Sequence, residues 1–208
     1  MRIRTTAVAL WLFVGSITTG IVEAEAPVPL TVRLYNGARR DARALLAARN
    51  VAAPILRDAG LDVTFRMCGE VTMDGSFVDP CDDPLKPSEV VVRVIDAPAA
   101  SATLSPDAYG MTYVVEETNR GWLATVFADR IERAAARVEL EPSTLLGRVT
   151  AHEVGHLLLG RGYHGDAGLM QAQWPDAVLH ERRTMAWRFS SSEALAMQRV
   201  LTNAPSFR

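Results

Sequence analysis

A five-residue motif, His152-Glu153-Val154-Gly155-His156, constrains this chain more than any other feature of its 208 residues. Residues four apart lie on one face of an α-helix, so two imidazoles at this spacing can offer their nitrogens to one metal ion. Glu153 lies about 100° further around the helix and reaches an open coordination position beside them. The motif therefore predicts a helix that carries a zinc site for hydrolysis.

A third histidine follows the motif closely. A catalytic zinc site takes three protein ligands and one exchangeable water, so the third ligand has to come from a chain reversal beyond the helix. Gly160 and Gly162 permit that reversal, because glycine tolerates positive φ and commonly ends helices. We expect His164 to supply the third ligand, and Asp166 and Glu181 are the alternatives that the sequence leaves open.

The segment HEVGHLLLGRGYH, with the sequence Gly-Leu-Met at 168–170, resembles the signature of the metzincin clan of metallopeptidases, HExxHxxGxxH followed by a Met-turn. The Gly-x-Met segment is similar to that of matrixin-like enzymes. Gly160 comes one residue later than the family's glycine, and His164 comes two residues later than its third histidine. The resemblance implies one catalytic Zn²⁺ held by His152, His156 and His164, with Glu153 as general base and Met170 in the Met-turn.

These residues predict a zinc-dependent endopeptidase, which hydrolyses peptide bonds with a zinc-activated water. An exported zinc-binding module without peptidase activity is the alternative, and a coincidental motif on an ordinary helix is the third possibility. Glu153 argues against a purely structural zinc site. Such a site closes its fourth coordination position with a protein ligand and has no use for a carboxylate beside the first histidine. His164 and Met170 argue against coincidence.

The N-terminus has the pattern of a secretory signal peptide. Arg2 and Arg4 precede an apolar run at 7–17, which small residues follow. The run is shorter than the ~20 residues of a membrane span, so we expect cleavage after Ala24 rather than an uncleaved anchor, although a cut after Ala26 also fits. We assign residues 1–24 to the signal peptide and 25–208 to a single catalytic domain, without an inhibitory pro-domain.

The number of cysteines and the net charge limit where the protein can be located and which partners it can bind. Cys68 and Cys81 are the only cysteines, and in an oxidising compartment such a pair most simply forms one disulfide, which agrees with a secreted or periplasmic protein. A balance of 22 basic and 24 acidic residues lacks the basic surface that nucleic acids require. We expect a peptide or protein substrate, no nucleic acid, no membrane after signal cleavage, and a monomer.

Alternating and helical hydrophobic patterns predict an α+β domain. The resemblance implies a twisted, mostly parallel sheet of about five strands with an antiparallel edge strand, which we place at 108–115, packed by helices that include the zinc-binding one. An extended peptide could add to that edge. The expected strands are 30–35, 61–67, 89–96, 111–115 and 122–127, and the expected helices are 41–59, 129–138, one starting at Pro142 or Ser143, and 191–202.

Overall fold

The computed structural model describes residues 26–69, 81–98, 105, 107–181 and 184–203. The expected signal peptide, residues 1–24, lies outside this range. Within the range, no helix is both long and apolar enough to span a bilayer.

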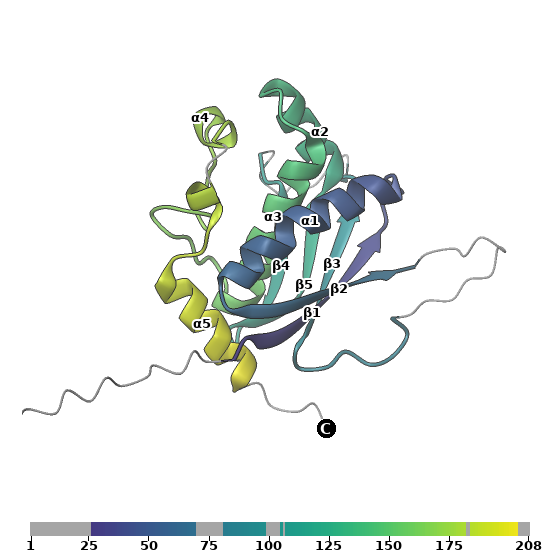
Figure 1. Ribbon diagram of the computed structural model, residues 1–208. Helices are drawn as coiled ribbons and strands as arrows, with labels where there is room; N and C mark the ends of the chain where they lie inside the picture. The colour runs from purple at the N-terminus through teal and green to yellow at the C-terminus, as the bar shows by residue number, and fades with distance from the viewer. Residues whose placement is uncertain (1–25, 70–80, 99–104, 106, 182–183, 204–208) are drawn as a thin grey trace, which may run out of the picture.

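Five strands form one sheet in the order β2-β1-β3-β5-β4 (Figure 1). Every neighbouring pair is parallel except β4 with β5, so β4 is an antiparallel edge strand. The α+β architecture expected from the sequence is confirmed, including the position of this edge. The strands are β1 (Val28–Asn36), β2 (Leu61–Cys68), β3 (Glu89–Ile95), β4 (Gly110–Val115) and β5 (Arg120–Phe127).

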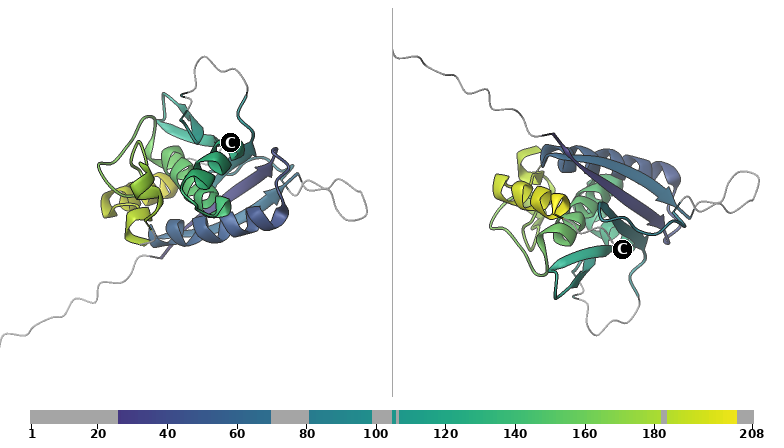
Figure 2. Two further views of the ribbon diagram at one scale, coloured as in Figure 1. Left: turned by 90° about the horizontal axis from the view of Figure 1, so that it is seen from above. Right: turned by 90° about the horizontal axis from the view of Figure 1, so that it is seen from below.

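Helices cover one face of the sheet, where α1 and α3 lie side by side (Figures 1 and 2). The Asp41 side chain caps the start of α1 by accepting a hydrogen bond from the Arg43 backbone N–H, and Pro54 lies inside the helix without splitting it. The short elements α4 and η1 have no counterpart among the predicted elements. The helices are α1 (Ala42–Asp58), α2 (Ala128–Arg137), α3 (Pro142–Leu159), α4 (Asp176–Leu179), the 3-10 helix η1 (Thr184–Trp187) and α5 (Ser191–Thr202).

A buried arginine organises the opposite face of the sheet. Arg33 on β1 forms an ion pair with Glu89 on β3, and both side chains are almost fully buried. The same guanidinium donates hydrogen bonds to the backbone carbonyls of Cys81 and Asp83, at 2.8 and 2.7 Å. Cys81 is joined to Cys68 by the disulfide that the sequence predicted. Arg33 and the disulfide therefore fasten the segment before β3 to the sheet.

Helix α3 crosses α1 at a glycine. A Cβ atom built on Gly147 would lie 2.4 Å from the backbone carbonyl oxygen of Ala48 and 2.6 Å from Cβ of Val51. Backbone atoms of α1 cannot yield as a flexible side chain can, so only glycine allows this approach. The crossing fixes the rotation of α3, and with it the direction in which the motif residues point.

We therefore expect Gly147→Ala to destabilise the protein by about 1–3 kcal/mol, because overpacking forces the two helices apart. Thermal and urea denaturation of the purified protein measure this loss. Ser191→Ala, at an exposed position of α5, is the control and should stay within about 0.5 kcal/mol of the wild type. Equal stability of Gly147→Ala and wild type would show that α1 and α3 can accommodate a Cβ atom at this crossing.

Candidate metal centre

Two histidines project from α3 toward one point. The side chains of His152 and His156 are one helical turn apart, and their residues are only 9% and 8% exposed. Their Nε2 atoms lie 3.0 Å apart. The helical spacing thus brings two ring nitrogens into the proximity that the sequence predicted.

A hydrogen bond on the far side of the His152 ring defines which of its nitrogens is free. Nδ1 of His152 lies 2.8 Å from the backbone carbonyl oxygen of Leu169, which can only accept, so Nδ1 carries the proton and Nε2 presents a lone pair. The backbone of Gly160 raises the pKa of His156, against the larger effect of burial, which lowers it. The Nε2 atoms of the two rings face each other across 3.0 Å, and neutral imidazoles in this arrangement can both bind one cation.

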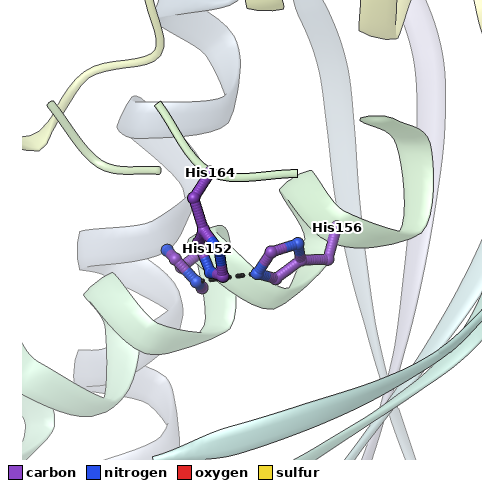
Figure 3. A group of neighbouring side chains, drawn as sticks. All are labelled: His152, His156 and His164. Atoms are coloured by element: carbon purple, nitrogen blue, oxygen red, sulfur yellow. Dashed lines mark hydrogen bonds between the residues drawn. The ribbon is translucent and has the colours of Figure 1, made fainter. Parts of the chain in front are cut away.

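The third histidine arrives from the chain reversal after α3. Gly160 ends the helix with φ of +100°, and Gly162 has φ of +66°, so both occupy backbone conformations that favour glycine. His164 then returns over the helix, as Figure 3 shows, and its ring centroid lies 4.9 Å from that of His156. One ring nitrogen from each of His152, His156 and His164 lies within 4.8 Å of the others.

The alternative third ligands do not join this group. Within the described residues, the three histidines are the only cluster of histidine, cysteine or carboxylate groups with metal-binding spacing. Asp166 and Glu181 are outside it. His180 lies exposed at the end of α4 and is also outside the group.

The ligand set fits zinc. A tetrahedral ion with Zn–N distances of ~2.0–2.1 Å separates its nitrogen ligands by roughly 3.3 Å, close to the separation of the two Nε2 atoms. Burial lowers the pKa of His152 to about 4 and that of His156 to about 3. Both imidazoles are therefore neutral at neutral pH, the form in which histidine binds a metal.

Glu153 lies beside the histidines with its carboxylate turned toward the edge strand. The residue is 5% exposed, and its Oε2 accepts a hydrogen bond of 2.5 Å from the hydroxyl of Thr112 on β4. Burial raises the pKa of Glu153 to about 7, and the hydrogen bond from Thr112 acts in the opposite direction. A carboxyl group with a pKa near neutrality can both take and return a proton.

Met170 lies behind the metal centre, fully buried against α3. A Cβ atom on Gly155 would lie 2.6 Å from Sδ of Met170 and 2.8 Å from Cε1 of Phe189. The glycine inside the motif thus leaves room for the methionine, a contact that the sequence analysis did not foresee. The backbone returns under the site, because the Gly165 N–H donates to the Met170 carbonyl.

The metal centre opens into a cleft of about 690 Å³. One side is formed by β4 and α2, and the other by the chain from Gly160 to Asp176. Trp174 borders this cleft and packs edge-on against His152, with ring centroids 5.2 Å apart. A salt bridge between Arg137 and Asp176 joins the two sides at 3.0 Å. The three histidines therefore line a cleft that this salt bridge crosses.

Of two neighbouring tryptophans, Trp174 borders the cleft and Trp187 is buried behind it. Trp187 lies deeper than Trp174, with ring centroids 5.0 Å apart, and stacks on the guanidinium of Arg148 at 3.8 Å. Arg148 also donates hydrogen bonds to the carbonyls of Leu179 and Glu181, each 3.2 Å long. This residue of α3 therefore fixes the segment that follows the cleft wall.

Comparisons with known proteins support the fold. No family model matches the sequence, and no curated protein matches it. Solved structures do match, among them the archaemetzincin of Methanopyrus kandleri, with 13% identity and a TM-score of 0.54 over 88% of this chain and 100% of that one. At this identity the likeness shows a shared fold and leaves the chemistry to be argued from the residues.

We expect His164→Ala to weaken zinc binding by more than about 100-fold, because it removes one of three nitrogens, whereas outer-sphere partners of zinc ligands contribute 10–100-fold. Isothermal titration with zinc measures the affinity and the stoichiometry. Asp166→Ala and Glu181→Gln are the controls and should still bind one zinc per chain. Loss of zinc in Asp166→Ala with retention in His164→Ala would reverse the assignment.

The lowered histidine pKa values predict acid sensitivity of the metal-free protein. The unfolded chain binds protons at His152 and His156 below pH 6.5, whereas the folded protein does not until about pH 4 or lower. The two histidines therefore cost no stability above pH 6.5. Their contribution lowers the free energy of unfolding as the pH decreases from 6.5 toward 4. Glu153 has the opposite dependence, since its raised pKa costs stability as the pH rises from 4.5 to about 7.

The histidine contribution is isolated by measuring melting temperature against pH for chelated Glu153→Gln. We expect a decrease from pH 6.5 to 4.5 that becomes smaller when His156→Asn is added. A melting temperature that is flat over this range in Glu153→Gln would contradict the burial of neutral imidazoles.

Proposed function

We propose that the protein is a secreted zinc-dependent endopeptidase. The observation that carries this proposal is the pair of Nε2 atoms of His152 and His156 facing each other, with His164 within reach and a buried carboxylate beside them. A purely structural zinc site has no use for that carboxylate and does not open into a cleft. The name of the fold neighbour, an archaemetzincin, agrees with a metzincin-like peptidase.

His152, His156 and His164 would hold the ion. Zinc bound by three imidazoles supplies Lewis acidity, which lowers the pKa of a water and polarises a carbonyl group. The protein's own contribution is the preparation of the ligands: the Leu169 carbonyl holds the proton of the His152 ring on the side away from the site, and burial lowers the pKa of both rings. Metal binding near neutral pH then requires no deprotonation of these rings.

Glu153 would act as the general base. Its carboxylate is next to the first histidine along the helix and faces the cleft that a substrate would occupy. A pKa of about 7 lies close to the working pH of most enzymes, where a base accepts a proton from water and returns it to a leaving amine. The raised pKa follows from burial and thus from the fold itself.

Strand β4 would bind the substrate backbone. Among the described strands β4 pairs with β5 alone, so its other edge has unpaired N–H and C=O groups that border the cleft. A peptide in extended conformation can satisfy these groups as an added strand. Main-chain recognition of this kind suits an endopeptidase, because it requires no particular substrate side chain.

Export of the enzyme and the absence of a stable partner also belong to the proposal. The N-terminal pattern of Arg2, Arg4 and the apolar run predicts secretion or periplasmic location, and the disulfide between Cys68 and Cys81 is compatible with an oxidising compartment. We propose that the mature protein acts as a monomer on peptides or proteins.

The decisive experiment incubates the mature protein with an unbiased peptide pool and identifies the cuts by mass spectrometry. We expect internal cleavage that a chelator abolishes and that Glu153→Gln reduces by about 10²–10⁴-fold, the usual contribution of a general base. Glu117→Gln, at an exposed turn, is the matched control and should cleave like the wild type. A wild type that binds one zinc but leaves the pool intact would favour the zinc-binding module instead.

A further inference from the structure

The edge strand has an inner face that contacts the motif helix. Gly110 and Thr112 lie opposite Val126 and Ala124 of β5, which are fully buried. Because side chains alternate along a strand, Gly110 and Thr112 face α3, while Met111 and Tyr113 are 41% and 60% exposed on the other face. The inner face of β4 is therefore a wall of the metal centre.

Both oxygens of the Glu153 carboxylate lie against this inner face. The Thr112 hydroxyl is 2.5 Å from Oε2, whereas its distance to the Glu153 backbone carbonyl is 3.5 Å, so its single proton goes to the carboxylate. On the other side, a Cβ atom on Gly110 would lie 2.5 Å from Oε1 and 2.7 Å from Cδ. Gly110 provides the space, and Thr112 provides the donor.

Thr112 is the only side chain in the described part of the chain that hydrogen-bonds this carboxylate. Without it, the terminal torsion of a glutamate has a broad range of settings, and the carboxylate would turn in the space that Gly110 leaves. A hydrogen bond to a charged acceptor is short, and this one measures 2.5 Å. It therefore selects one orientation of the carboxylate relative to the three histidines.

From this geometry we infer that Thr112 is a positioning residue for the general base, with Gly110 as the position that makes room for it. The inference rests on the proposed function, because the consequence of the contact is catalytic. Strand β4 then has two roles: its outer edge aligns the peptide, and its inner face aligns the carboxylate that activates water. The register of one strand sets the distance between them.

The test compares Thr112→Val, which keeps the shape and removes the donor, with Thr112→Ser, which keeps the hydroxyl. We expect Thr112→Val to lower kcat by about 10- to 100-fold, the range for a lost hydrogen bond to a charged group, with KM within about twofold of the wild type. Thr112→Ser should recover most of kcat. Thr64→Val, on the exposed face of β2, is the matched control and should retain wild-type kinetics.

A second measurement uses the chelated protein and needs no activity. If Thr112 acts through Glu153, Thr112→Val lowers the melting temperature in the wild-type background, where it leaves a buried carboxylate without its donor, and does so much less in Glu153→Ala. Equal decreases in the two backgrounds would overturn the inference. So would an unchanged kcat in Thr112→Val, or a loss in Thr112→Ser as large as that in Thr112→Val.

These outcomes are separable from failure of the proposed function. A wild type that binds zinc but cleaves no peptide overturns the peptidase proposal, and the catalytic role of Thr112 falls with it. A wild type that cleaves peptides, together with normal kcat in Thr112→Val, overturns the positioning role alone. Gly110→Ala adds an independent check, because crowding of the carboxylate should lower kcat while zinc is still bound.

Discussion

Burial of ionisable groups on α3 is the constraint from which the rest of the site follows. His152, Glu153 and His156 are each less than 10% exposed, and a buried polar group costs free energy unless it is neutral or paired. For His152 and Glu153 the hydrogen-bond partners do not lie on α3. They come from distant segments: the Leu169 carbonyl for His152 and the Thr112 hydroxyl for Glu153. The chemistry of the motif thus depends on contacts far along the chain.

The loop after α3 is held in place mainly by hydrogen bonds of its backbone. Gly165 donates to the Met170 carbonyl, and the Leu169 N–H donates to the carbonyl of Arg188, just before α5. Glu193 of α5 is buried, caps its own helix together with Ser190, and lies against Gly165. The part of the loop that follows His164 is therefore fixed by hydrogen bonds. This explains how His164 reaches the other histidines although it follows them two residues later than in the metzincin signature.

Local patterns in the sequence located the strands and helices, because these follow from short-range rules, whereas the arrangement of the sheet came from the resemblance to the metzincin clan. Period-two alternation located the strands to within two residues at most ends, and helical spacing brought His152 and His156 together. Thr112 was missed because its contact spans 41 residues, and nothing in the strand distinguishes it from Thr125 on the neighbouring strand. The stacking of Trp187 on Arg148 was likewise invisible, since it depends on how the chain returns after Met170.

The edge strand β4 combines a local pattern of the sequence with a long-range contact. An unpaired edge invites association with other chains, and proteins limit that risk with short edges and irregular register. Strand β4 has six residues, and its pairing with β5 shifts between Tyr113 and Val114. The regular part that remains, 110–113, contains both residues that contact Glu153. The stretch best able to accept another strand is therefore the one whose inner face holds the carboxylate, so a peptide bound there would extend past the three histidines.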